Sequence, residues 1–503
     1  MKHARPGART SPETDTRDLA RGAGVNYLGF VARLGARAPF LFLAALLYGE
    51  ARFGEYTFGI TVVETAAALA LFGMKRSLFK FMSEAVERGE TVHRAVANGV
   101  ALALVTGTVA TLAVGFGAGL LATLFRLPSA AGTLRWLTPA LPMIVLSDIL
   151  LVAIRFTRQM RFEVWARSVA EPITLTTTIV IAYYAGARDT GLFLGYVASL
   201  TVAAALSLFF FARLYSVRAL LRAPPRWSEM RSLITFSGPT AGYELLILLA
   251  DKADVFLVTY FLPLEAVGVY GMARQFATVS KKIRQGFDRI LPPILSQSIA
   301  AGEIGRAREQ LCTVSRWILS VQLLIVLGFV FYARDLLGLL GGQFGGGAMI
   351  LILLLAAEAI NGSLGVAELP IVYLRPGANL GVGAAMLVLT LGTGAWLIPE
   401  IGPEGAALAL VITYAFVNAL RIGVNRRLFH LTTVGPSLLK PLIAALPAAG
   451  SVLLLQRLAA SVPAVHTVLG IPVLIATYVG ALVLLGLEPE DRAQLRRLRR
   501  RRG

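Results

Sequence analysis

Long apolar stretches, separated by short polar loops, run along most of the chain. Many are longer than the roughly 20 apolar residues that cross a bilayer as a helix. The pattern predicts helices at about 23–49, 53–83, 91–125, 133–157, 161–186, 190–213, 232–262, 265–296, 308–340, 345–373, 378–400, 403–425, 436–457 and 464–487. We therefore expect an all-α polytopic membrane protein with about 14 transmembrane helices.

Two hairpin turns share a sequence pattern. The first reads EARFGEY from Glu50 to Tyr56, and a later one reads EAVGVY from Glu265 to Tyr270. Both contain Glu-Ala and then Gly-x-Tyr, and 215 residues (265 − 50) separate the two glutamates. We expect the glycine to permit the chain reversal and the tyrosine to anchor the next helix at the membrane interface. The repeat indicates two pseudo-symmetric six-helix lobes around a central cleft, an arrangement common in transporters.

These elements divide the chain into six parts. They are a disordered cytoplasmic tail at 1–22, an N-lobe at 23–213, a cytoplasmic linker at 214–231, a C-lobe at 232–425, two further helices at 436–487 and a basic cytoplasmic tail at 488–503. Most of the 48 Lys and Arg residues fall on one side of this arrangement. The positive-inside rule then places both termini in the cytoplasm.

Composition agrees with this membrane assignment. Only 15% of the residues are charged and the mean hydropathy is +0.69, whereas soluble domains contain about 25% charged residues. The net charge of +19 belongs to cytoplasmic loops and the basic tail, which favours anionic lipid over nucleic acid as a partner. The single cysteine, Cys312, excludes an intramolecular disulfide, and no pattern predicts a metal or another cofactor. Without a Walker A motif, the chain is not expected to hydrolyse ATP.

The two hairpins also resemble a known family. The stretch LYGEARFGEYTFGITVVETAAALALFGMKRSLFKFMSEA looks like the opening hairpin of the polysaccharide-export branch of the multidrug/oligosaccharidyl-lipid/polysaccharide exporter superfamily. The seventh and eighth helices of that branch carry an early Gly-Pro, an aspartate and a later Gly-x-Tyr, which are matched here by Gly238-Pro239, Asp254, and Gly268 with Tyr270.

The resemblance implies a Wzx-like flippase and not an enzyme. Such a protein moves polyprenyl-pyrophosphate-linked oligosaccharide across the inner membrane by alternating access, for the synthesis of lipopolysaccharide O-antigen or exopolysaccharide. The implied partners are that lipid-linked oligosaccharide, the lipid bilayer, a polysaccharide polymerase and glycosyltransferases.

Several ionisable residues lie inside the predicted helices, where charge is costly and usually functional. The candidate cavity cations are Arg33, Arg37, Lys252 and Arg274, and the candidate coupling or charge-balancing acids are Glu64, Glu244, Asp251 and Asp254. Arg33 and Arg37 share one helix face, and the repeat offset relates Arg37 to Lys252. Cations at this depth would compensate a pyrophosphate, which suits the planar guanidinium fork. The alternative is an ion-pair network that only holds helices together, and we favour it for the two aspartates, as partners of Lys252 or Arg274.

Three other functions stay open. A lipid II flippase of the same superfamily would carry an acidic Asp-Ala-Phe-like signature where this chain has GEYTFG at 54–59. A cation-coupled drug exporter would favour acids where the first helix offers two arginines. A membrane polysaccharide polymerase or ligase would need a large outer loop, and none of the predicted outer loops is long.

Overall fold

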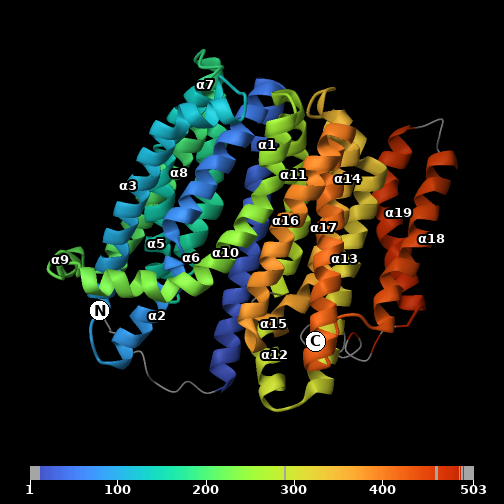
Figure 1. Ribbon diagram of the computed structural model, residues 1–503. Coiled ribbons are helices and arrows are strands. Elements are labelled where there is room, and N and C mark those ends of the chain that lie inside the picture. The colour runs from blue at the N-terminus through green and yellow to red at the C-terminus, as the bar shows by residue number, and fades with distance from the viewer. Residues whose placement is uncertain (1–11, 288–290, 459–462, 487, 489–490, 492–503) are drawn as a thin grey trace. The chain divides into compact units, whose positions relative to one another are not determined.

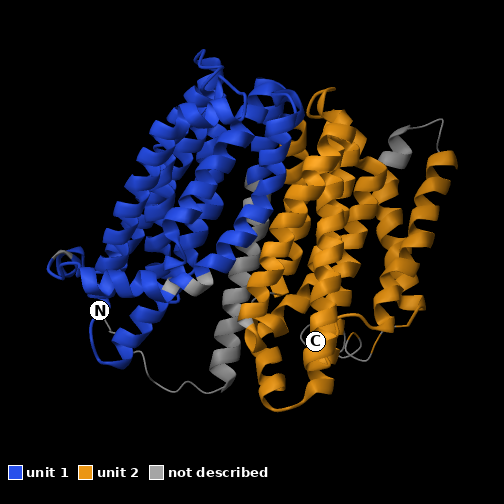
Figure 2. Ribbon diagram, in the orientation of Figure 1, with its two compact units in different colours: residues 1–268 blue, residues 269–503 orange. Residues whose placement is uncertain are grey.

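The computed structural model describes residues 12–287, 291–458, 463–486, 488 and 491, without the side chains of residues 12–34, 36, 221, 237, 239, 240, 376 and 463–467. Helix is the only regular secondary structure in these residues (Figure 1). The chain forms two compact units, Met1–Gly268 and Val269–Gly503 (Figure 2). Each of the fourteen predicted segments is largely helical, and this confirms the all-α polytopic class.

The first helix, α1 (Pro12–Leu71), is a hairpin. Gly49 interrupts it with φ 73° and ψ 178°, a conformation that costs an L side chain but not glycine. The rings of Phe40 and Tyr56 lie 5.8 Å apart, whereas sixteen residues of straight helix would separate them by about 24 Å. The chain therefore reverses at Gly49, directly before the repeat motif, and not at Gly54 as the repeat pattern predicts.

Helix α1 begins at Pro12 and not near residue 23, so residues 12–22 of the expected disordered tail are helical. Proline is well suited to the first position of a helix.

The rest of unit 1 packs around the second half of α1. Its elements are α2 (Met74–Glu87), α3 (His93–Leu124), α4 (Ala130–Leu137), α5 (Ala140–Phe156), α6 (Arg161–Glu163), the π-helical turn η1 (Val164–Ala170), α7 (Glu171–Tyr184), α8 (Gly191–Leu214), α9 (Val217–Leu221) and α10 (Trp227–Phe261), followed by the start of α11 (Leu264–Phe287). Helix α5 packs on α3 and α8, and α7 packs on α8.

Unit 1 extends past the predicted linker at 214–231. Helix α10, expected to open the C-lobe, packs instead on α1, α2 and α3. Two ion pairs hold it there. Lys252 Nζ lies 2.7 Å from Glu64 of α1, and Arg76 of α2 lies 3.0 Å from Glu244. The boundary between the two compact units thus lies after α10, at Gly268.

Unit 2 is built around a long central helix. Its elements after α11 are α12 (Leu291–Ala300), α13 (Ile304–Gly338), η2 (Phe344–Gly347), α14 (Ala348–Leu364), η3 (Gly365–Ala367), α15 (Glu368–Leu374), α16 (Pro376–Ile401), α17 (Pro403–Phe429), η4 (Pro436–Leu438), α18 (Leu439–Leu458) and α19 (Pro463–Leu484). The last two helices pack on α13 through an apolar cluster of Tyr332, Ala444, Ala448, Val452, Leu474 and Tyr478.

Polar side chains bond backbone carbonyl groups at the helix break at η3. Arg284 of α11 donates to the carbonyl oxygens of Asn361 and Gly365, both at 3.2 Å. Glu368 lies 3.1 Å from Arg284 and 3.3 Å from Arg421 of α17. Irregular backbone at membrane depth persists only where neighbouring groups satisfy it, as they do here.

Nine helices of the described residues are long and apolar enough to cross a membrane, or ten if the bent helix α10 is one span. The difference from fourteen has physical reasons. The α1 hairpin contains two of the predicted segments within one continuous helical stretch. The segment at 161–184 is divided by the π-helical turn, and α11 carries several charged residues.

Candidate functional site

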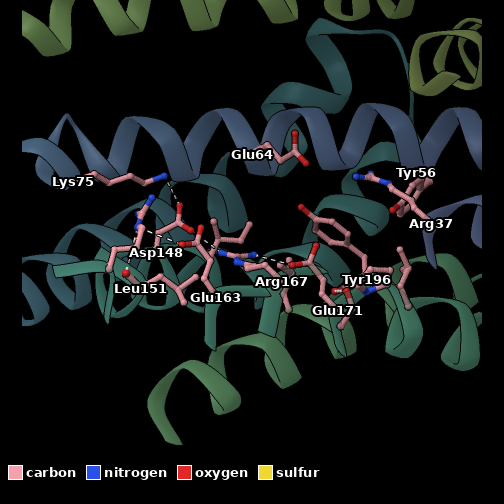
Figure 3. Close-up of a pocket in the computed structure, with 16 residues that line it drawn as sticks. Arg37, Tyr56, Glu64, Lys75, Asp148, Leu151, Glu163, Arg167, Glu171 and Tyr196 are labelled. Carbon is pink, nitrogen blue, oxygen red and sulfur yellow. Dashed lines mark hydrogen bonds and ion pairs between the residues drawn. The ribbon is translucent and has the colours of Figure 1, made fainter. Parts of the chain in front are cut away.

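A polar cavity of about 330 Å³ lies inside unit 1 (Figure 3). Side chains from α1, α2, α5, α6, η1, α7 and α8 line it. Its lining contains four carboxylates and four cations, which are Glu64, Asp148, Glu163 and Glu171 with Arg37, Lys75, Arg155 and Arg167. The formal charge of the lining is therefore zero, and its pairing decides what it can bind.

A chain of ion pairs occupies one end of the cavity. Asp148 accepts from Lys75 at 2.6 Å and from Arg167 at 2.7 Å. Arg167 also reaches Glu171 at 3.1 Å and the Ser147 hydroxyl at 2.7 Å. Figure 3 shows the three pairs running from α2 across α5 to α7. Buried charges are stable only when paired and hydrogen-bonded in this way.

The π-helical turn η1 positions Arg167 in this chain of ion pairs. It spans residues 164–170 and is followed directly by Glu171 and Pro172. Proline lacks the N–H that an α-helix would pair with the carbonyl four residues earlier. Single π-turns inside helices are frequent at functional sites. Here the turn presents Arg167 and Glu171 to the same cavity.

Arg37 and Tyr56 lie at the opposite end of the cavity (Figure 3). Arg37 Nε is buried and has no hydrogen-bond partner among the described residues. Within the same residues, each acid of the lining is paired with another cation. Arg37 thus supplies a positive charge and an unused donor. The side chain of Arg33, its predicted companion, lies outside the described residues.

Tyr56 was expected at the membrane interface, and this is wrong. Its side chain is only 1% exposed, and its repeat counterpart Tyr270 is fully buried. Tyr56 packs against Phe40, Phe53 and Tyr196, and its hydroxyl has no partner in the described part of the chain. The shared spacing of the repeat therefore delivers a cavity residue and not a membrane anchor.

Lys252 is paired with Glu64 and not with the aspartates beside it. Glu64 also lines the cavity together with Arg37. Of the two cations that the repeat offset relates, Lys252 pairs with this carboxylate and Arg37 lines the same cavity. Arg274 is half-buried and belongs to unit 2.

The three acids of α10 have different surroundings. Glu244 pairs with Arg76 at 3.0 Å and is substantially exposed. Asp254 is 2% exposed, and it accepts a hydrogen bond from the Val255 N–H at 2.8 Å. Asp251 is half-buried. None of the three lines the cavity described above.

The site residues predicted from the sequence do not include Asp148, Arg167 and Glu171. A signal was present, because Asp148 is a lone acid in the apolar stretch MIVLSDILLVAIRF, and Arg167 and Glu171 stand four apart inside a predicted helix. Among the described residues, no cluster of His, Cys, Asp and Glu has the arrangement of a metal site.

The comparisons with known proteins agree with the sequence resemblance. The family model "Polysaccharide biosynthesis protein" matches residues 19–299, which is more than half of the chain. The chain belongs to this family. A comparison with curated proteins finds no significant match.

Solved structures show the same fold as this family member. "Lipid II flippase MurJ, inward closed conformation" has a TM-score of 0.71 at 13% identity, covering 91% of this chain and 98% of that one. An inward-facing multidrug resistance MATE family transporter of the MOP superfamily has a TM-score of 0.64 at 14% identity, covering 79% and 97%. A mutant of the Vibrio cholerae MATE transporter VcmN has a TM-score of 0.57 at 14% identity, covering 82% and 98%. The protein is thus a multi-pass membrane protein with an exporter fold.

Proposed function

We propose that this protein flips polyprenyl-pyrophosphate-linked oligosaccharide from the inner to the outer leaflet of a bacterial inner membrane, for the synthesis of a surface polysaccharide. Transport proceeds by alternating access, with both termini in the cytoplasm. Membership of the polysaccharide biosynthesis family and the flippase-like fold support this proposal. The observation that carries it is the unpaired donor of Arg37 in the cavity of unit 1.

Arg37 suits a phosphate for a physical reason. Lys252, which is not part of the lining, pairs with Glu64, so the lining and Lys252 together carry one net positive charge, which belongs to Arg37. A lipid-linked pyrophosphate brings that negative charge and acceptor oxygens, and a guanidinium binds them through charge-assisted hydrogen bonds. Each such bond contributes about 1.5–3 kcal/mol. Losing it would weaken binding roughly 10-fold to 100-fold.

The acids have a second role in this proposal. When the cavity is empty, Glu64 holds Lys252, and the other carboxylates hold Arg167, Lys75 and Arg155. A pyrophosphate that competes with Glu64 would release Lys252 toward the substrate. The remaining candidate residues, Arg33, Arg274, Glu244, Asp251 and Asp254, are proposed as further cavity or coupling groups.

Gene deletion and complementation test the proposal. Deleting the gene in its host should remove the surface polysaccharide and accumulate an oligosaccharide on polyprenyl pyrophosphate. Wild-type protein should restore the polysaccharide, Arg37→Ala should not, and Arg37→Lys should restore it in part. Arg135→Ala, at an exposed position of α4, is the matched control. Normal polysaccharide with well-expressed Arg37→Ala would overturn the role of Arg37.

A lipid II flippase is the second candidate, favoured by the TM-score of 0.71 with MurJ. Both substrates would present a pyrophosphate to Arg37, so the cavity does not separate them. The lipid that accumulates in the same deletion strain separates the two functions. Accumulated lipid II and loss of the cell wall would establish this function, whereas a viable strain that accumulates another lipid-linked sugar supports the oligosaccharide flippase.

A further inference from the structure

The two repeat glycines pack against each other's hairpins within unit 1. A Cβ on Gly54 would overlap the carbonyl oxygen of Leu264 and lie 3.0 Å from the backbone nitrogen of Gly268. A Cβ on Gly268 would overlap the carbonyl oxygen of Glu50 and lie 2.8 Å from its carbonyl carbon. Each glycine thus receives the backbone of the opposite turn. These glycines were predicted to permit the chain reversal, but Gly49 is the residue at which the first hairpin reverses.

Only glycine allows this approach. The atoms that an added Cβ would meet are backbone atoms and not the ends of flexible side chains. Small residues let helix backbones approach closely inside membranes, where Cα–H groups contact carbonyl oxygens. Both glycines are buried. An alanine at either position must therefore push the two turns apart.

Side-chain bonds fasten the first turn to its own helix bundle. Arg52 bonds Glu55 at 2.9 Å and Asp189, in the loop before α8, at 2.5 Å. The Tyr48 hydroxyl donates to the Ile179 carbonyl of α7 at 2.6 Å. These bonds hold the first turn against α7 and α8. Separation at the glycines would therefore displace the second turn, between α10 and α11.

The contact also carries an opposing force. Glu50 and Glu265, the first residues of the two repeat motifs, are like charges close enough to disfavour each other's ionised form. Close backbone packing holds the turns together while like charges push them apart. Such a balance allows a contact to open and close rather than lock. Tyr56, two residues after Gly54, lies in the cavity lining, so the contact adjoins the proposed substrate site.

We propose that Gly54 and Gly268 form the contact at which an outer gate closes. The gate is closed when the two turns meet, and it opens the cavity to the outside when they separate. This inference rests on the proposed function for its direction, because the turns face outward in the orientation proposed above. The two glycines determine how tightly the gate closes, and the paired glutamates determine how readily it reopens.

Labelling of a single cysteine tests the gate without substrate. Cys312→Ser removes the only native thiol, and Ser199→Cys places a reporter in the cavity lining. In intact cells or spheroplasts, Gly54→Ala and Gly268→Ala should each raise the rate of labelling by a membrane-impermeant maleimide at least about 10-fold. Gly117→Ala is the matched control, because a Cβ there meets nothing within 4 Å, and it should leave the rate unchanged.

A second pair of variants tests the gate even if the alanine variants fold poorly. Glu50→Gln and Glu265→Gln remove the repulsion without adding volume, and each should slow labelling by at least about 3-fold. Unchanged labelling in well-folded glycine variants, or faster labelling in the glutamine variants, would overturn the gate. Because labelling requires no substrate, its outcome is independent of which lipid-linked sugar the deletion strain accumulates.

Discussion

Replacing Asp148 by asparagine should destabilise the protein. Most of the loss should come from the ion pair with Arg167 and little of it from the ion pair with Lys75. Asp148 accepts from Arg167 and Lys75, whose side chains are 14% and 46% exposed. Lys75 can turn to water, so its bond contributes about 0–1 kcal/mol. Arg167 keeps Glu171 and Ser147 but loses a buried charge-assisted bond of about 1.5–3 kcal/mol. The expected loss is about 2 kcal/mol.

Thermal unfolding in detergent measures this difference. At about 2–4 °C per kcal/mol for units of this size, Asp148→Asn should lower the Tm by about 4–8 °C. Lys75→Met is the matched control and should lower it by less than about 4 °C. All variants should be heated at one scan rate, because membrane proteins often unfold irreversibly. A Lys75→Met loss equal to that of Asp148→Asn, or an unchanged Tm for Asp148→Asn, would refute the assigned pairing.

Two further predictions concern unit 2. A Cβ on Gly405 of α17 would overlap a backbone carbonyl at the end of α16, whereas a Cβ on Gly423, also in α17, meets nothing within 4 Å. Gly405→Ala should therefore lower the Tm by several degrees, and Gly423→Ala should leave the Tm equal or higher. Equal losses of Tm in the two variants would contradict this packing. Burial raises the pKa of the Asp491 carboxyl, but hydrogen bonds from Arg316 and Trp317 prevail and hold that pKa below its ordinary 3.8. The stabilisation by the ionised Asp491 carboxyl is then complete above pH 3.8 and is lost as the pH falls further. The Tm difference between wild type and Asp491→Asn should therefore stay constant from pH 7 to 4 and shrink below pH 4. A difference that shrinks already near neutral pH would contradict this prediction.

The helices, the hairpin repeat and the family could be predicted because their signals are local. Apolar runs of bilayer length identify helices wherever they occur. The repeat pattern singled out Gly54 and Gly268 for chain reversal, which is wrong for Gly54, because Gly49 reverses the chain and both glycines pack against backbone. Their role depends on which turn packs against which, and this close backbone contact has no trace in the spacing of one hairpin alone.

The pairing of the charges could not be predicted for the same reason. Lys252 has aspartates on both sides in the sequence, yet a helix directs neighbouring side chains apart, and its partner is Glu64 of another helix. Arg167 reaches Asp148 through a π-helical turn that hydrophobic periodicity does not reveal. Packing between helices, and not their individual patterns, sets these contacts.

Flipping by purified protein in vesicles tests the central claim most directly. Vesicles would contain a polyprenyl-pyrophosphate-linked oligosaccharide with a fluorescent sugar, and an impermeant glycosidase added outside would report arrival in the outer leaflet. Wild-type protein should expose the inner pool, and Arg37→Ala should slow this exposure at least about 10-fold while Arg135→Ala matches wild type. No acceleration over protein-free vesicles, or equal rates for Arg37→Ala and wild type, would contradict the account.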